Sequence, residues 1–172
     1  MKYTNWKQIP KFTRTPTYAV DVAWHEVPKT LAGWEADLNP DFQRGHVWTR
    51  EQQVRFVEFC FRGGDSGRNV FLNAPRFRLG YRDGMVLVDG KQRVEAWAAF
   101  YRNEFALFGD TYSSDLGQLP YTEHWACARL HVNDLKTRAE VLTWYLEMNS
   151  GGTPHAESEL NRVKSLLVGE AS

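Results

Sequence analysis

One short stretch of the sequence changes its hydrophobic period abruptly. Residues 85–88 form a continuous apolar run of the kind found in short buried strands. Asp89 and Gly90 end this run, and apolar residues then recur at helical spacing in Val94, Trp97 and Tyr101. A strand that passes so directly into an amphipathic helix needs a sheet with helices against it. We therefore predict an α+β fold: a small, mixed, mostly antiparallel sheet with helices packed around it.

Several other segments show a strand-like pattern. The predicted strands are 17–27, 69–72, 77–81, 85–88, 105–108 and 126–132. Two of these runs flank Asp83-Gly84, and such a dipeptide favours a type I′ turn because both central residues need positive φ. The pattern predicts a tight hairpin at this dipeptide, with Asp89 at the end of its second strand.

The helices have clear end signals. Thr49 and Gln52 form a capping-box pattern, and Gly63-Gly64 is typical of a helix C-terminus. We expect a short helical or irregular piece around 31–38 and a helix over about 135–148. A last helix should start at Thr153-Pro154, with the threonine as N-cap and the proline at the first position.

Composition excludes several classes of protein. Hydrophobic residues make up 42 % of the 172 residues and aromatic residues 14 %, which is too apolar for a disordered chain. We expect an extended arm over 1–20, where Pro10 and Pro16 lie, and one domain over 21–172. The 21 basic and 21 acidic side chains cancel, so any contact with DNA must use local basic patches. No apolar run is long enough for a membrane span, and we expect a cytoplasmic protein without a membrane partner.

Cysteine and histidine give no sign of a metal site. Cys60 and Cys127 lie in apolar segments and read as two buried thiols. The five histidines are scattered, and none forms a ligand pair at helical spacing. We predict no protein metal centre.

The segment Asp89-Gly90-Lys91-Gln92-Arg93 is the first candidate site. A glycine lets the backbone approach a ligand, and a helix start offers free N–H groups to an anion. Lys91 and Arg93 add positive charge, and arginine can hold two phosphate oxygens in its planar fork. The alternative is a structural turn before a helix whose first residues are polar.

Two further segments are weaker alone. In 41–48, Gln43 and Arg44 could form hydrogen bonds with the edge of a ligand, and Trp48 could stack on a ligand ring. Trp48 could equally form a hydrophobic staple at the start of the helix capped by Thr49. In 149–152, Asn149, Gly151 and Gly152 could form an anion nest, although such stretches more often only end a helix.

Together, the three segments resemble a known family. The order Phe-Gln-Arg-Gly-His-Val-Trp, Leu-Val-Asp-Gly-Lys-Gln-Arg-Val-Glu-Ala and Glu-Met-Asn-Ser-Gly-Gly-Thr-Pro, followed by Glu159-Leu160, resembles the N-terminal domain of GmrSD-type restriction enzymes. That domain belongs to the ParB/sulfiredoxin-like superfamily, and the resemblance covers about residues 30–165. The sequence departs from the family at Lys91, where glutamine is usual, and lacks the family's His-Asn-His nuclease half.

The resemblance implies a nucleotide-handling domain linked to DNA or to phage–host conflict, as phage defence or anti-defence. Its ligand would be an NTP, with Mg²⁺ as a candidate companion ion. Carried over by motif, the implied catalytic residues are Asp89, Gln92 and Arg93. The implied nucleotide-binding residues are Gln43, Arg44, Gly90, Lys91, Asn149, Gly151 and Gly152, with Trp48 for stacking.

Two functions remain open at this point. The first is an enzyme, either an NTP hydrolase or a nucleotide-dependent nuclease, that uses Asp89 and Arg93. The second is a regulatory module that binds a nucleotide or nucleic-acid phosphate without turnover and acts through a protein partner. Local basic clusters for DNA lie at 62–68 and 76–82. Without the nuclease half, we expect no efficient cutting of duplex DNA.

Overall fold

The computed structural model describes residues 8–9, 18–43, 48–117, 126–149 and 157–170. The strands are β1 (Tyr18–Ala23), β2 (Asn69–Asn73), β3 (Val86–Asp89) and β4 (Cys127–Asn133). The α-helices are α1 (Val27–Gly33), α2 (Arg50–Phe61), α3 (Lys91–Tyr101), α4 (Arg138–Asn149) and α5 (Glu157–Glu170). Short 3₁₀ helices cover Trp24–Glu26 (η2), Phe77–Leu79 (η3) and Ser113–Asp115 (η4).

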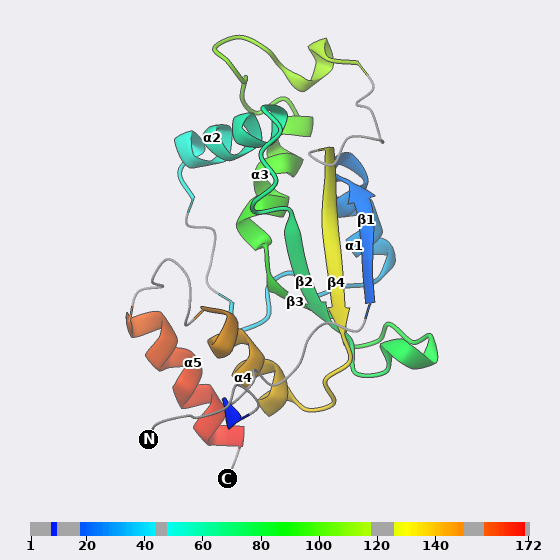
Figure 1. Ribbon diagram of the computed structural model, residues 1–172, viewed down its shortest axis with the longest axis vertical. Coiled ribbons are helices and arrows are strands. Elements are labelled where there is room, and N and C mark those ends of the chain that lie inside the picture. The colour runs from blue at the N-terminus through cyan, green and yellow to red at the C-terminus, as the bar shows by residue number, and fades with distance from the viewer. Residues whose placement is uncertain (1–7, 10–17, 44–47, 118–125, 150–156, 171–172) are drawn as a thin grey trace.

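The four strands form one sheet in the order β1-β4-β2-β3. β1 pairs with β4 and β2 pairs with β3 in the antiparallel sense, whereas β2 and β4 run parallel. The predicted mixed, mostly antiparallel sheet is therefore confirmed. Figure 1 shows α4 and α5 together at one end of the molecule, apart from α1, α2 and α3.

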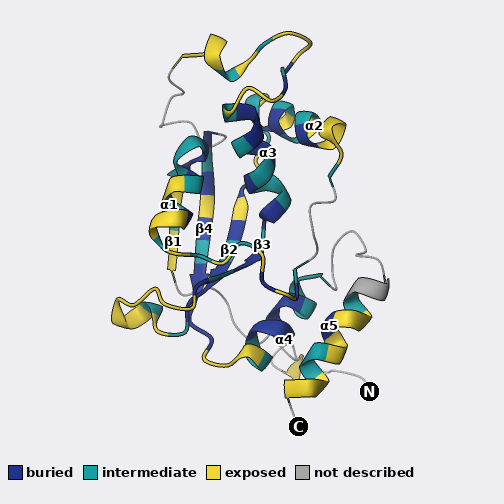
Figure 2. Cartoon of the chain, turned by 180° about the vertical axis from the view of Figure 1, so that it is seen from behind, coloured by how far each residue is buried: buried dark blue, intermediate teal, exposed yellow. Residues whose placement is uncertain are grey.

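The sheet separates two hydrophobic clusters. Alternate residues of β2 and β4, such as Val70 and Leu130, belong to the main core with Trp24, Trp97 and Phe100. A second cluster at α4 and α5 contains the following buried residues: Phe42, Val88, Leu135, Val141, Leu142, Trp144, Tyr145 and Val163. In Figure 2, α1, α2 and α5 combine dark blue with yellow turns, as amphipathic helices do, whereas α3 is dark blue and teal without an exposed residue.

Both ends of α2 form as predicted. The Thr49 side chain accepts a hydrogen bond from the Gln52 backbone, and the Gln52 side chain accepts one from the Thr49 backbone at 2.8 Å. At the other end Gly63 has φ +84°, and its N–H donates to the Cys60 carbonyl, while the Gly64 N–H donates to Phe59. These bonds define a Schellman motif, which explains the glycine at this position.

The predicted tight hairpin at Asp83-Gly84 is wrong. Residues 77–79 form a 3₁₀ helix, and the antiparallel partner of β3 is β2, so a long connection joins the two strands. The alternating apolar residues misled the prediction because they do not line a buried face: Leu79 is 71 % exposed and Tyr81 54 %. The other half of the prediction is confirmed, since Asp89 ends β3 and α3 begins two residues later.

Three smaller expectations also need correction. Segment 105–108 is no strand and contributes only an isolated bridge between Leu107 and Thr111. The short helical or irregular piece expected around 31–38 is a helix that begins earlier, at Val27, and ends at Gly33. Residues 18–20, which we assigned both to the N-terminal arm and to a strand over 17–27, belong to β1, and this strand ends at Ala23, where the 3₁₀ helix Trp24–Glu26 follows. The start of the last helix at Thr153-Pro154 lies outside the described residues.

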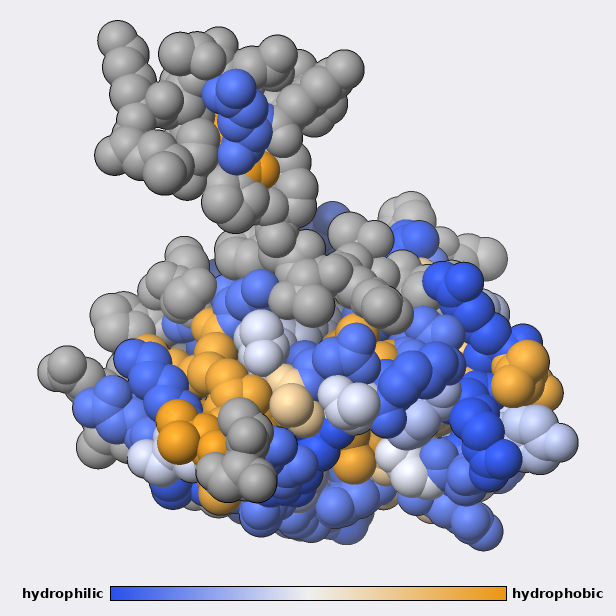
Figure 3. Space-filling model, turned by 90° about the horizontal axis from the view of Figure 1, so that it is seen from below, coloured by the Kyte–Doolittle hydropathy of each residue, from blue (hydrophilic) through white to orange (hydrophobic). Residues whose placement is uncertain are grey.

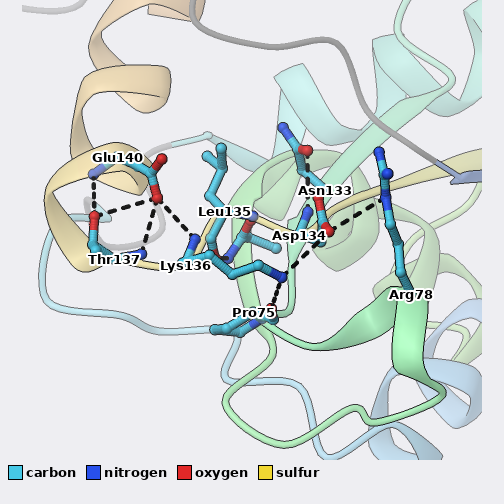
Figure 4. A network of polar contacts seen from close by, with 9 residues as sticks. Pro75, Arg78, Asn133, Asp134, Leu135, Lys136, Thr137 and Glu140 are labelled. Atoms are coloured by element: carbon cyan, nitrogen blue, oxygen red, sulfur yellow. Dashed lines mark hydrogen bonds and ion pairs between the residues drawn. The ribbon is translucent and has the colours of Figure 1, made fainter.

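A polar network fixes the turn from β4 into α4 (Figure 4). Asp134 is buried, and its carboxylate lies 3.3 Å from both Arg78 Nε and Lys136 Nζ. Just beyond it, Glu140 Oε2 accepts hydrogen bonds from the backbone N–H groups of Lys136 and Thr137, at 2.8 and 3.1 Å. The Glu140 N–H in turn donates to the Thr137 hydroxyl, so a capping box starts α4.

Hydrophilic side chains cover most of the described surface at the end of the molecule that carries α4 and α5. Apolar side chains gather toward one side of this face (Figure 3). Within the described ranges, no helix is both long and apolar enough to span a bilayer.

Candidate functional site

Asp89 and Arg93 form an ion pair at the junction of β3 and α3. They lie one helical turn apart, and Arg93 Nη2 donates to Asp89 Oδ2 at 2.8 Å. The side chains are 39 % and 20 % exposed respectively. The Nε of Arg93 is buried and has no hydrogen-bond partner in the part of the chain that the structure describes. The carboxylate thus orients a guanidinium that keeps donor capacity for a further group.

Gly90 has a structural reason to be glycine. Its φ is +107°, and a Cβ built on it would lie 3.1 Å from Val70 Cα in β2. The chain can turn from β3 into α3 here only because the residue lacks a side chain. In the described structure, the group that approaches Gly90 closely is therefore the neighbouring strand.

The two side chains between Gly90 and Arg93 bind other parts of the protein. Lys91 is 8 % exposed, and its Nζ donates to Asn39 Oδ1 at 2.7 Å. Gln92 Oε1 accepts a hydrogen bond from the Trp48 backbone N–H at 3.0 Å. Gln92 therefore positions the residue that we predict to stack on a ring.

Two residues of the 41–48 segment, Gln43 before Arg44 and Trp48 after it, bind β3 and α3. Gln43 Nε2 donates to the Leu87 carbonyl at 2.9 Å, which satisfies an edge carbonyl of β3. Trp48 is held by Gln92, as described above. Arg44 itself lies outside the described residues. Two of the three predicted motifs are thus joined although more than 40 residues separate them.

The third motif approaches the same region through α4. Asn149 is the last residue of α4, and its Nδ2 donates to the Tyr145 carbonyl at 2.7 Å. The Tyr145 ring packs edge-on against Phe42, with the ring centroids 5.5 Å apart. Phe42 directly precedes Gln43, so the end of α4 lies beside the 41–48 segment. Gly151 and Gly152 lie outside the described residues.

Two arginines that the sequence analysis did not single out fix this arrangement. Arg138 Nη2 donates to both carboxylate oxygens of Asp41, at 2.8 and 2.6 Å, and this hydrogen bond lowers the pKa of Asp41. Arg162 in α5 donates to the backbone carbonyls of Asp41 and Phe42 at 2.5 and 2.8 Å. The partners lie about a hundred residues apart in the sequence, and no local pattern could have predicted them.

An open groove of about 480 Å³ lies beside Arg93. Its walls come from one face of α2, from the turn before β2 and from Trp48. The lining residues are Trp48, Gln52, Arg55, Phe56, Phe59, Ser66, Gly67 and Arg93. The four from α2 follow the spacing i, i+3, i+4, i+7 of a single helical face, a signal that was present in the sequence. The groove combines aromatic surface with two guanidinium groups.

Neither cysteine contributes to this site. Cys60 is buried in the main core, and burial raises its pKa to about 12. Cys127 is half-buried in β4, and burial raises its pKa as well. The expectation of two buried thiols holds fully for Cys60 and in part for Cys127. The described ranges contain no group of three or more His, Cys, Asp or Glu residues placed to hold a metal ion.

We compared the chain with family models, curated proteins and solved structures. No family model matches the chain, and neither a curated protein nor a solved structure matches it.

Proposed function

We propose that the chain binds a nucleoside triphosphate at the junction of β3 and α3. The observation that carries this proposal is the position of Arg93, which Asp89 orients at the edge of an aromatic-lined groove. A nucleotide has the complementary chemistry, because it joins a flat aromatic base to a chain of anionic phosphates. Arginine binds phosphate through charge-assisted hydrogen bonds, and aromatic side chains stack on every base.

The phosphates would lie at Arg93 and at the first turn of α3, whose backbone N–H groups have no acceptor within the helix. The base would lie against the aromatic side chains of the groove, Trp48, Phe56 and Phe59. A volume of about 480 Å³ falls within the range of small-molecule sites. Mg²⁺ would arrive with the phosphates, since it binds through phosphate oxygens with few protein carboxylates, and Asp89 is the nearest carboxylate to Arg93.

The resemblance to GmrSD-type domains supports the same ligand and adds a context. In that context, hydrolysis of the nucleotide would accompany contact with DNA in phage–host conflict. The connection between β2 and β3 offers Arg76 and Arg82 for such a contact; these guanidinium groups lie over the rings of Tyr81 and Trp34.

One observation favours the alternative of binding without turnover. Lys91 stands where the family usually has glutamine, and its ammonium group is turned toward Asn39. A lysine cannot orient an attacking water as an amide could. The second candidate is therefore a regulatory module that holds a nucleotide or a nucleic-acid phosphate and acts through a protein partner.

A panel of labelled NTPs distinguishes the two candidates. Equilibrium dialysis measures retention, and product analysis in the presence and absence of Mg²⁺ measures turnover. The enzyme predicts both, and Asp89→Ala should abolish turnover with a much smaller effect on affinity, because the change removes a carboxylate that repels phosphate but also releases the Arg93 guanidinium. Retention without product for every NTP would favour the binding module. A chain that retains no nucleotide at millimolar concentration would refute the proposal.

A further inference from the structure

A second guanidinium group, that of Arg55, lines the groove, and the phosphate site at Arg93 does not use it. The side chain of Arg93 is 20 % exposed and that of Arg55 is 73 % exposed, so Arg93 lies at the inner end of the groove and Arg55 at its rim. Gly67 leaves room at the inner end, because a Cβ built on it would lie 3.1 Å from Phe56 Cε2 and 3.7 Å from Arg93 Cδ. The positive charge at the rim is therefore available to a part of the ligand other than the phosphates.

Phe59 gives this rim a flat apolar surface. It is 43 % exposed, more than a large aromatic side chain needs to be in a helix that packs on the core. A Cβ built on Gly64 would lie 2.3 Å from the Phe59 ring, so the ring rests directly on the backbone of the turn after α2. Arg55 and Phe59 are four residues apart in α2, and such side chains are neighbours on a helix surface. A base stacked on Phe59 would thus present its edge to Arg55.

The polar side chains around this position are mainly hydrogen-bond donors. Arg55 bonds to Glu51 in an exposed pair one helical turn apart, and pairs of this kind are weak enough to yield to another acceptor. Gln52 Oε1 accepts the Thr49 N–H, which leaves the amide NH₂ group of Gln52 to donate. No aspartate or glutamate is among the described residues that line the groove. A base edge with two acceptors therefore suits this rim better than an edge that carries a donor.

We propose that Arg55 makes the groove selective for guanine nucleotides. The inference rests on the proposed function, with the phosphates at Arg93 and the base on Phe59. Guanine presents O6 and N7 side by side as acceptors, and the planar fork of an arginine donates to both. Adenine presents its N6 amino group beside N7, and this donor would face the donors of Arg55. Cytosine and uracil have no N7 to complete the pair of contacts.

Nucleotide analogues test this inference in the unchanged protein. Inosine triphosphate keeps O6 and N7 and lacks the 2-amino group, whereas 7-deaza-GTP lacks the N7 acceptor. Calorimetry should give similar Kd values for GTP and inosine triphosphate, and both should bind roughly five- to a hundredfold more tightly than ATP. Replacing GTP by 7-deaza-GTP should weaken binding roughly two- to tenfold, because one of the two hydrogen bonds is lost.

Arg55→Ala assigns the selectivity to this side chain. The variant should lose the preference for GTP over ATP and keep the wild-type affinity for ATP. Arg62→Ala is the matched control and should keep the preference, because Arg62 caps the same helix, lies over the Phe108 ring and does not line the groove.

Three results would overturn the inference and leave the proposed binding at Arg93 intact. They are equal binding of GTP and ATP by the wild type, equal binding of GTP and 7-deaza-GTP, and a preference for GTP that persists in Arg55→Ala. A chain that binds no nucleotide would instead overturn the proposed function.

Discussion

Asp89, Gly90 and Arg93 illustrate how neighbouring residues in one motif take different roles. Asp89 and Arg93 form an ion pair at 2.8 Å, and the buried Nε of Arg93 has no hydrogen-bond partner among the described residues. Gly90 needs no ligand for its explanation. Its positive φ and its contact with Val70 account for the glycine through the fold alone.

The role of Gly90 predicts a specific stability difference. Gly90→Ala should destabilise the protein by about 2 kcal/mol or more, because positive φ strains a side chain and the new Cβ would press on the Val70 backbone. Gly109→Ala is the matched control: Gly109 has φ +103°, and a Cβ there would meet no atom within 4 Å. Urea unfolding of the two variants isolates the contact with Val70. Equal losses of stability in both variants would contradict this explanation.

At the scale of elements, local sequence signals predicted helix ends well, whereas the sequence pattern did not predict contacts between distant segments. The capping box and the two glycines of α2 are local, and both ends of that helix formed as predicted. The alternation at 77–81 is also local but did not reflect burial, so it predicted a false strand. The contacts that assemble the site, such as Gln43 with Leu87 and Arg162 with Phe42, join distant segments and leave no periodic signal.

The start of α4 had a local signal that can be tested. The prediction began this helix near 135, whereas Thr137 and Glu140 form a capping box and the helix begins at Arg138. Thr137→Ala should lower the free energy of unfolding by about 0.5–2 kcal/mol. Thr143→Ala, within the same helix, should change it by less than about 0.5 kcal/mol, because alanine has the higher helix propensity. A loss in Thr143→Ala as large as that in Thr137→Ala would contradict the assigned cap.

Across the whole molecule, ion pairs and hydrogen bonds hold the 41–48 segment against α4 and α5. Asp41 bonds to Arg138, which also lies 3.0 Å from Glu170 near the end of α5. The start of α4 is thereby tied to the segment before Gln43, and Asn149 lies at the other end of this helix. The arrangement of the candidate site therefore depends on ion pairs between distant parts of the chain.

Acid should weaken this connection. Arg138 lowers the pKa of Asp41 below its ordinary value of 3.8 in the folded protein. A lowered folded pKa contributes stability above pH 3.8, and this contribution is lost as the pH falls through the folded pKa. Arg138→Gln should therefore be less stable than wild type at pH 7, by less than about 1 kcal/mol for such an exposed pair. The difference should shrink below pH 3.8, and unfolding curves that keep a constant difference into acid would contradict the role of this pair.

The central claim is that Arg93 holds a nucleotide phosphate, and calorimetric titration with ATP, GTP and CTP tests it most directly. Charge-assisted contacts of this kind contribute about 1.5–3 kcal/mol, so Arg93→Ala should weaken binding roughly ten- to a hundredfold. Arg102→Ala should bind as wild type does, because Arg102 pairs with Glu104 and does not line the groove beside Arg93. If the wild type binds no nucleotide more tightly than the millimolar range, or if Arg93→Ala binds as well as wild type, the claim is contradicted and the motif is a structural turn.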